Sequence, residues 1–174
     1  MIARLLLVGA LVTLVACASQ SPASSSSQVW DAQGVRFTAP PGWRLEADGE
    51  APSGVVVYVT NKSHVACPSA APACSSAIAQ LQRGGVLVAW YVQHCVAHGC
   101  DLPAGDQILV GGRVAVRYQG PGFCGGLLAT AEVVVMVLVT PQRVDRIVTC
   151  LRDPAPATTE ALAAMFDSIQ WRTP

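Results

Sequence analysis

The sequence predicts an α+β domain in which an antiparallel β-sheet is flanked by helices, including a C-terminal amphipathic helix. Residues 86–92 and 133–139 are unbroken apolar runs rich in β-branched side chains, which is typical of strands buried on both faces. Near the C-terminus, apolar residues recur at the i, i+3, i+4, i+7 spacing of one helix face: Leu162, Met165, Phe166 and Ile169. Burying these four side chains is worth about 6 to 12 kcal/mol before entropy is subtracted, so this helix should lie on the sheet.

Three shorter strands are expected before the first apolar run. Val35 and Phe37 alternate with polar residues, the Pro-Pro-Gly turn at 40–42 ends that strand, and residues 43–46 continue the alternation. Residues 55–60 are rich in β-branched and aromatic side chains and form the third strand. A short helix is expected at residues 75–82.

The second half of the chain predicts a further strand, one hairpin and the final helix. A Gly-Gly turn at 111–112 introduces a strand at 113–118, whose arginine-bearing face should be exposed to water. Residues 140–143 have turn chemistry and should join strands 133–139 and 144–150. The helix is expected to begin between Pro156 and Thr159, with Asp153 or Thr158 as its cap.

Composition restricts the class of protein and of partner. Of 174 residues, 52% are hydrophobic and only 13% are charged, about half the usual charged share, which excludes a disordered chain. The 11 basic and 11 acidic side chains balance, and no basic run occurs. A nucleic acid is therefore not an expected partner.

The N-terminus has the pattern of an exported lipoprotein. Arg4 is followed by residues 5–16, which carry no charge and, at about 18 Å of helix, are too short to span a hydrocarbon core of about 30 Å. Residues 1–16 therefore predict a signal peptide. Leu14-Val15-Ala16-Cys17 resembles the bacterial lipobox. By that resemblance, Cys17 is the lipidation site, carrying a diacylglyceryl thioether and a further acyl chain such as palmitate on its freed amine. The alternative is an ordinary secretory signal in which Cys17 is incidental.

This reading divides the chain into three parts. Residues 1–16 are the signal peptide, residues 17–28 are the lipidated cysteine and a Ser-rich tether with a reach of about 18 Å, and residues 29–174 are one globular domain. Several acyl chains make release from a bilayer slow, because each buried methylene adds about 0.8 kcal/mol. The expected location is the outer, extracytoplasmic face of the cell membrane, with the membrane as partner through Cys17.

Six further cysteines favour disulfides, because an even number in an exported chain is typical of oxidative pairing. The short spacings predict Cys67 with Cys74 and Cys95 with Cys100, leaving Cys124 with Cys150; other connectivities stay open. Simple hairpin register does not bring the last pair together, so a bend at Gly125-Gly126 would be needed.

A metal site is the alternative interpretation of the same region. His94, Cys95, His98 and Cys100 lie within seven residues, with His64 and Cys67 upstream. Zinc accepts such ligands, but the spacing is not that of a zinc knuckle and an oxidising compartment would consume the thiols. We therefore expect no metal and no cofactor.

The order of these signals resembles a known family. The residues concerned are Val35-Arg36-Phe37-Thr38-Ala39-Pro40-Pro41-Gly42-Trp43, then Gly111-Gly112-Arg113-Val114-Ala115, then a final helix ending in Ser168-Ile169-Gln170-Trp171. Together they resemble the PsbP-like lipoproteins of actinobacteria over residues 35–171. The resemblance implies an α/β/α sandwich and an accessory or binding protein.

No catalytic set is evident in the sequence, which lacks Gly-x-Ser-x-Gly, P-loop and dinucleotide motifs. Glu46, Asp48 and Glu50 are better explained as a solvated rim than as a calcium or acid site. Asp101 and Asp106 are expected in turns. The four tryptophans, at 30, 43, 90 and 171, are expected as core or strand-end anchors rather than as a ligand box.

The predicted function is a membrane-anchored binding or accessory module of the cell envelope, with an envelope protein or a small apolar ligand as partner. Two alternatives remain. One is a cell-envelope enzyme, such as a hydrolase, with a site built from loops. The other is a carrier that holds an apolar ligand under the C-terminal helix, which would require a large apolar cavity there.

Overall fold

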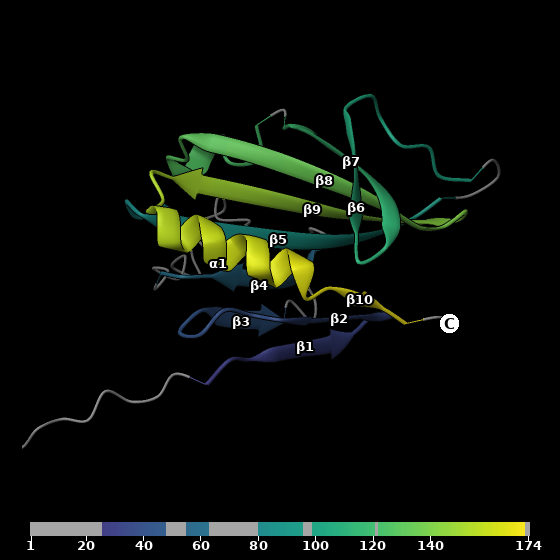
Figure 1. Ribbon diagram of the computed structural model, residues 1–174. Helices are drawn as coiled ribbons and strands as arrows, with labels where there is room; N and C mark the ends of the chain where they lie inside the picture. Colours follow the sequence, from purple (N-terminus) through teal and green to yellow (C-terminus); the bar gives the residue numbers. More distant parts are fainter. Residues whose placement is uncertain (1–25, 48–54, 63–79, 96–98, 121, 173–174) are drawn as a thin grey trace, which may run out of the picture.

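A seven-stranded antiparallel sheet forms the body of the domain in the computed structural model, which describes residues 26–47, 55–62, 80–95, 99–120 and 122–172 (Figure 1). Its strand order is β3-β4-β5-β9-β8-β7-β6. The bounds of these strands are β3 Arg44–Ala47, β4 Val55–Thr60, β5 Gly85–His94, β6 Asp106–Val110, β7 Arg113–Gln119, β8 Ala131–Thr140 and β9 Arg143–Arg152.

A smaller sheet and one helix complete the described structure. The small sheet has the order β1-β2-β10, with β1 Val29–Ala32, β2 Val35–Thr38 and β10 Gln170–Trp171, and the helix α1 spans Pro156–Asp167. In Figure 1 the yellow helix lies across the long strands of the larger sheet. The predicted α+β class with an antiparallel sheet is confirmed.

The described residues do not confirm the expectation of several flanking helices. These contain one α-helix, α1, and one 3-10 turn, η1, at Gly125–Leu127. Most of the helix expected at residues 75–82 lies outside the described residues, and residues 80–82 are not helical. Leu81 instead lies buried, and its backbone N–H donates to the carbonyl of Leu127 at 2.8 Å.

The strand β5 shows why its sequence is apolar at every position. Alternate side chains of a strand point to opposite faces of the sheet. Val86, Val88 and Trp90 enter the core beneath α1, whereas Leu87 and Tyr91 enter a second core on the opposite face. All are buried, so the predicted central position of this strand is confirmed.

The two cores have different covers. The helix-side core is closed by α1 and the small sheet and contains these buried residues: Val35, Phe37, Ala39, Trp43, Val57, Val59, Val86, Val88, Trp90, Val110, Ala115, Val135, Val137, Val139, Ile147, Leu162, Met165 and Ile169. The far core contains Val55, Tyr58, Leu81, Leu87, Ala89, Tyr91, Cys124, Leu127, Val134, Val148 and Cys150.

The predicted hairpin forms, because β8 pairs with β9 through a turn at Pro141 and Gln142. A second hairpin, which the sequence did not predict, pairs β6 with β7 through Gly111 and Gly112. The expectation that the arginine-bearing face of residues 113–118 is exposed is wrong, because that face turns toward the helix-side core and Ala115 is fully buried. The opposite face carries the exposed Val114 where the far core ends near the sheet edge.

The helix α1 begins where the prolines allow. Pro156 is its first residue, where the missing backbone N–H of proline is tolerated. The predicted caps are wrong, since the N-cap residue is Ala155, without a side-chain cap. Asp153 instead has a positive φ of 46° and pairs with Arg83.

Two of the predicted disulfides are present. Cys95 joins Cys100 and Cys124 joins Cys150, with Cα separations of 5.3 and 5.5 Å. The turn at η1 brings Cys124 over the far core, and its backbone N–H donates to Oε2 of Glu132 at 2.7 Å.

The remaining predictions about the N-terminus and the third disulfide concern Cys17, Cys67 and Cys74, which lie outside the described residues. Within the part of the chain that the structure describes, no helix has the length and apolar character needed to cross a membrane.

Candidate functional site

A groove of about 560 Å³ runs between α1 and the β6–β9 part of the larger sheet. Its lining residues are Asp106, Ile108, Leu109, Val110, Arg117, Tyr118, Gln119, Val133, Val135, Thr149, Leu151, Thr159, Leu162, Ala163, Phe166 and Asp167. Ten of the sixteen are aliphatic or aromatic. The volume falls within the range of small-molecule pockets, which is roughly 300 to 1,000 Å³.

One wall of the groove is a single face of α1. Thr159, Leu162, Ala163, Phe166 and Asp167 follow the helical repeat, so they lie on one side of the helix over a length of about 12 Å. Leu162 reaches into the helix-side core, whereas Ala163 is exposed and leaves space beside it. The groove is therefore elongated along the helix and open on one side.

The opposite wall is the β6–β7 hairpin at the edge of the sheet. Ile108 and Val110 of β6 face the groove, and Arg117 of β7 pairs with Asp106 across the hairpin, its Nη2 lying 3.1 Å from Oδ2. Both side chains of this pair are more than half exposed. The pair forms a solvated rim to an apolar groove, and Asp167 adds a second carboxylate at the helix.

The groove also holds a buried hydroxyl. Three polar or charged residues of the described structure are buried: Thr60, Asp145 and Thr149. The hydroxyl of Thr60 donates to the carbonyl of Val86 at 2.8 Å, and Asp145 accepts several hydrogen bonds. Thr149 is 3% exposed and lines the groove, yet its hydroxyl has no hydrogen-bond partner among the described residues.

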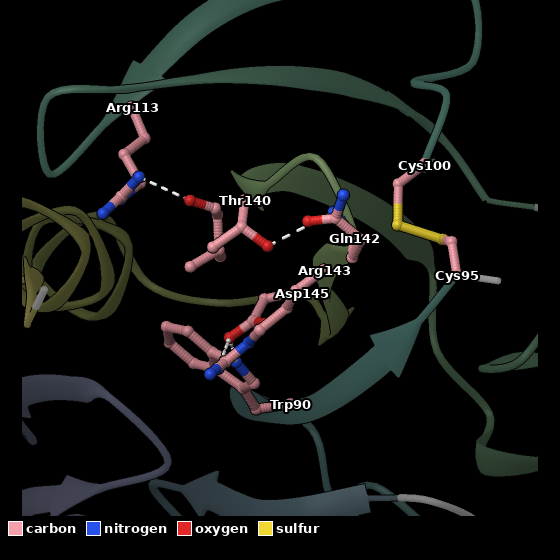
Figure 2. A network of polar contacts seen from close by, with 9 residues as sticks. Trp90, Cys95, Cys100, Arg113, Thr140, Gln142, Arg143 and Asp145 are labelled. Atoms are coloured by element: carbon pink, nitrogen blue, oxygen red, sulfur yellow. Dashed lines mark hydrogen bonds and ion pairs between the residues drawn. A yellow bond between two sulfur atoms is a disulfide. The ribbon is translucent and has the colours of Figure 1, made fainter. Parts of the chain in front are cut away.

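A buried ion pair lies at the other end of the same sheet face (Figure 2). Asp145 is fully buried and accepts hydrogen bonds from Nε and Nη2 of Arg143 at 2.6 and 2.8 Å. Its Oδ2 also accepts from Nε1 of Trp90 at 2.9 Å. A buried carboxylate needs both a counter-charge and hydrogen bonds, and these three groups supply them.

Neighbouring contacts hold that ion pair in place. The Cys95–Cys100 loop binds the β8–β9 turn, because the N–H of Cys95 donates to the carbonyl of Gln142 at 2.9 Å and that of Cys100 to Pro141 at 2.7 Å. The ring of Trp90 stacks on that of Phe37 with centroids 5.3 Å apart.

A third aromatic residue, Trp171 of β10, joins this cluster. Its ring centroid lies 5.8 Å from that of Trp90, and its Nε1 donates to the carbonyl of Val110 at 2.8 Å. The guanidinium of Arg113 lies over the Trp171 ring and donates to the carbonyl of Val139 at 2.5 Å. This end of the face is thus a structural anchor, and the expectation that Trp90 is a core residue is confirmed.

The far face carries a cation against an aromatic ring. The guanidinium carbon of Arg146 lies 4.4 Å from the ring centroid of Tyr91, and the ring of Phe123 meets Tyr91 edge-on. Burial, with a smaller contribution from Tyr58, raises the pKa of Tyr91 to about 12 despite the opposing effect of Arg146. The neutral phenol is therefore favoured, and this cluster packs the second core.

The predicted site residues are distributed unevenly over these features. Cys95 and Cys100 are bonded to each other, so their sulfur atoms are not free thiolate ligands, and His94 is exposed. His64, His98, Asp48 and Glu50 lie outside the described residues. Asp106, expected in a turn, begins β6 and forms the groove rim instead.

Sequence reasoning anticipated only part of the groove. It placed Leu162 and Phe166 on the inner face of the C-terminal helix, but it did not identify Thr149 or Ile108 as neighbours of that helix. The one signal that was present is a threonine between two apolar inward-facing residues of β9, Ile147 and Leu151.

Comparison of the chain with protein-family models, with curated proteins and with solved structures finds no match among any of them.

Proposed function

We propose that this protein is a membrane-anchored extracytoplasmic lipoprotein that binds a small apolar ligand in the groove beneath α1. The observation that carries the proposal is the groove itself: about 560 Å³ of space, lined mainly by apolar side chains. An apolar surface left open to water is unfavourable by about 25 cal/mol per Å², so an apolar occupant gains free energy by covering it.

Binding is favoured over hydrolysis by the chemistry of the lining. Among the described residues that line the groove there is no serine, cysteine, histidine or lysine. The polar groups present are carboxylates, an arginine, a glutamine, a tyrosine and two threonines, of which Arg117 and Asp106 are paired with each other. Such a lining supports packing against a ligand rather than a nucleophile beside its base.

The anchor rests on the sequence of the N-terminus. Leu14-Val15-Ala16-Cys17 follows an apolar leader, and the Ser-rich residues 18–28 give the domain a short tether. Lipidation of Cys17 would hold the domain close to the membrane surface, where apolar ligands are concentrated, because the tether reaches only about 18 Å. The two parts of the proposal support one another but are tested separately.

The resemblance to the PsbP-like lipoproteins belongs to the same proposal. The strand-turn-strand segment around Val35, the turn at Gly111 and the C-terminal helix occur in the order that the resemblance requires. We infer from this order a PsbP-like α/β/α sandwich over residues 35–171.

Ligand binding is tested with a fluorescent apolar probe and a pair of helix variants. Ala163→Trp places an indole in the groove, whereas Ala164→Trp places it on an exposed position outside the groove lining. We expect Ala163→Trp to weaken probe binding at least tenfold and Ala164→Trp to leave it unchanged. Equal binding by both variants and the parent chain would show that the probe does not occupy the groove.

Lipidation is tested by mass spectrometry of the protein purified from bacterial membranes. We expect cleavage before Cys17 and the mass of a diacylglyceryl group plus an acyl chain on that residue. Cys17→Ser should move the protein from the membrane fraction to the soluble fraction. An intact Met1 on the purified protein would overturn the anchor while leaving the groove untouched.

A further inference from the structure

We infer that the groove selects an uncharged amphiphile, such as a long-chain alcohol or a neutral acyl lipid, whose oxygen hydrogen-bonds to the hydroxyl of Thr149. The inference rests on the proposed binding function and names the class of ligand. It follows from two observations on the lining residues that the structure describes: a hydroxyl on the floor that borders the groove without a protein partner, and a single cation that is already paired.

The surroundings of Thr149 offer its hydroxyl no partner. Its neighbours across the sheet are Val88 on β5 and Val133 on β8, and the next inward-facing residues on its own strand are Ile147 and Leu151. All four side chains are aliphatic. Among the described residues, the fully enclosed side-chain atoms without a hydrogen bond are Trp30 Nε1, Glu132 Oε1 and Arg146 Nε, so the Thr149 oxygen still borders open space. Because Thr149 lines the groove, the partner it lacks can come from the groove's occupant.

The charges around the groove determine which oxygen-bearing ligands fit. The lining contains one cation, Arg117, and two carboxylates, Asp106 and Asp167. Arg117 is already paired with Asp106 at 3.1 Å. An anionic headgroup would therefore meet a net negative lining with no unpaired cation, whereas a hydroxyl or an ester oxygen carries no such penalty.

The test compares three ten-carbon ligands by displacement of the fluorescent probe from the full chain: decanol, chlorodecane and decanoate. We expect decanol to bind roughly fivefold more tightly than chlorodecane, the effect of one net hydrogen bond. Decanoate should bind more weakly than decanol. Tighter binding of decanoate than of decanol would overturn the assignment of a neutral ligand.

Two substitutions of Thr149 make the test specific. Thr149→Val keeps the shape and removes the hydroxyl, so it should bind chlorodecane as the parent chain does and lose the preference for decanol. Thr149→Ser retains a hydroxyl and should retain the preference. An unchanged preference in Thr149→Val would overturn the role of Thr149.

The outcomes separate this inference from the proposed function. If none of the three ligands displaces the probe, the binding function itself fails. If decanol and chlorodecane bind equally to the parent chain, the groove binds apolar ligands but the inference about Thr149 is wrong, with water as the partner of the hydroxyl.

Discussion

Asp145 and Thr149 lie on the same strand, β9, and on the same face of the sheet, yet their surroundings are opposite. Asp145 is fully buried and receives hydrogen bonds from Arg143 and Trp90. Thr149 is 3% exposed and receives none from the described residues. The buried carboxylate at one end is therefore satisfied by protein groups, whereas the hydroxyl at the other end borders a groove. The comparison separates a region that stabilises the fold from the region where we propose that a ligand binds.

The covers of the two ends account for this difference. Above Asp145, the small sheet and the stacked rings of Phe37 and Trp90 fill the space, and the Cys95–Cys100 loop fixes the adjacent turn. Above Thr149, the cover is one face of α1 and an edge hairpin that do not meet, so the groove remains between them. The following predictions test the two ends in turn.

The largest expected effect is at Asp145. Asp145→Ala leaves the guanidinium of Arg143, only 15% exposed, without its counter-charge and should lower the free energy of unfolding by about 3 to 5 kcal/mol. Urea unfolding measures this loss. The control is Arg83→Ala, which removes an exposed pair with Asp153 and should cost less than about 1 kcal/mol. Similar losses in both variants would mean that the buried Asp145–Arg143 pair contributes no more to the free energy of unfolding than the exposed pair does.

The next largest loss of stability is expected from removing the Cys95–Cys100 disulfide, near the Asp145 ion pair. The double substitution Cys95→Ala with Cys100→Ala should lower stability by about 2 kcal/mol, the chain-entropy value for so short a loop. Probe binding in the groove should not change, because the disulfide lies at the other end of the face. A loss of probe binding without a loss of stability would contradict the independence of the two ends.

A smaller effect is expected at Gly111, in the turn between β6 and β7. Gly111 has a φ of +55°, and a Cβ there would lie 2.6 Å from the carbonyl oxygen of Ile169. Gly111→Ala should cost about 1 to 2 kcal/mol, combining backbone strain with displacement of the groove wall. Gly112 also has a positive φ but open space around it, so Gly112→Ala measures the strain alone. Equal unfolding free energies for the two variants would show that the contact with Ile169 is unimportant.

The smallest effect, and the only gain, is expected at Thr149. Thr149→Val removes a hydroxyl without a partner and should leave stability unchanged or raise it by up to about 1 kcal/mol. Thr60 is the matched control, because it is equally buried and its hydroxyl donates to Val86. Thr60→Val should lower stability by about 1 kcal/mol. If both substitutions destabilise the chain equally, Thr149 has a partner and the contrast with Asp145 disappears.

Parts of the fold could be predicted because they depend on local pattern. The strand β5 is apolar throughout because both of its faces are buried, and the inward face of α1 follows from the spacing of Leu162 and Met165. The Cys95–Cys100 disulfide follows from proximity in the chain. The caps of α1 were mispredicted because proline at its first position suffices to begin the helix without a side-chain cap.

The candidate site, the groove beneath α1, could be predicted only in part. The helix face that forms one wall was identified, but the wall opposite depends on how the β6–β7 hairpin adds to the sheet edge. The alternation of Arg113 and Ala115 with valines shows a strand without showing which face is covered, and the exposed face was assigned incorrectly for that reason.

By itself, the sequence determined the long apolar strands, the β8–β9 hairpin, the final helix and the apolar character of residues 5–16, because each depends on residues close together in the chain. The tertiary structure alone decided which polar groups meet. Trp90 and Asp145 are 55 residues apart and form a hydrogen bond, whereas Thr149 has aliphatic neighbours from three strands and a groove above it. Whether a buried polar group is satisfied depends on distant segments, which periodicity does not bring together.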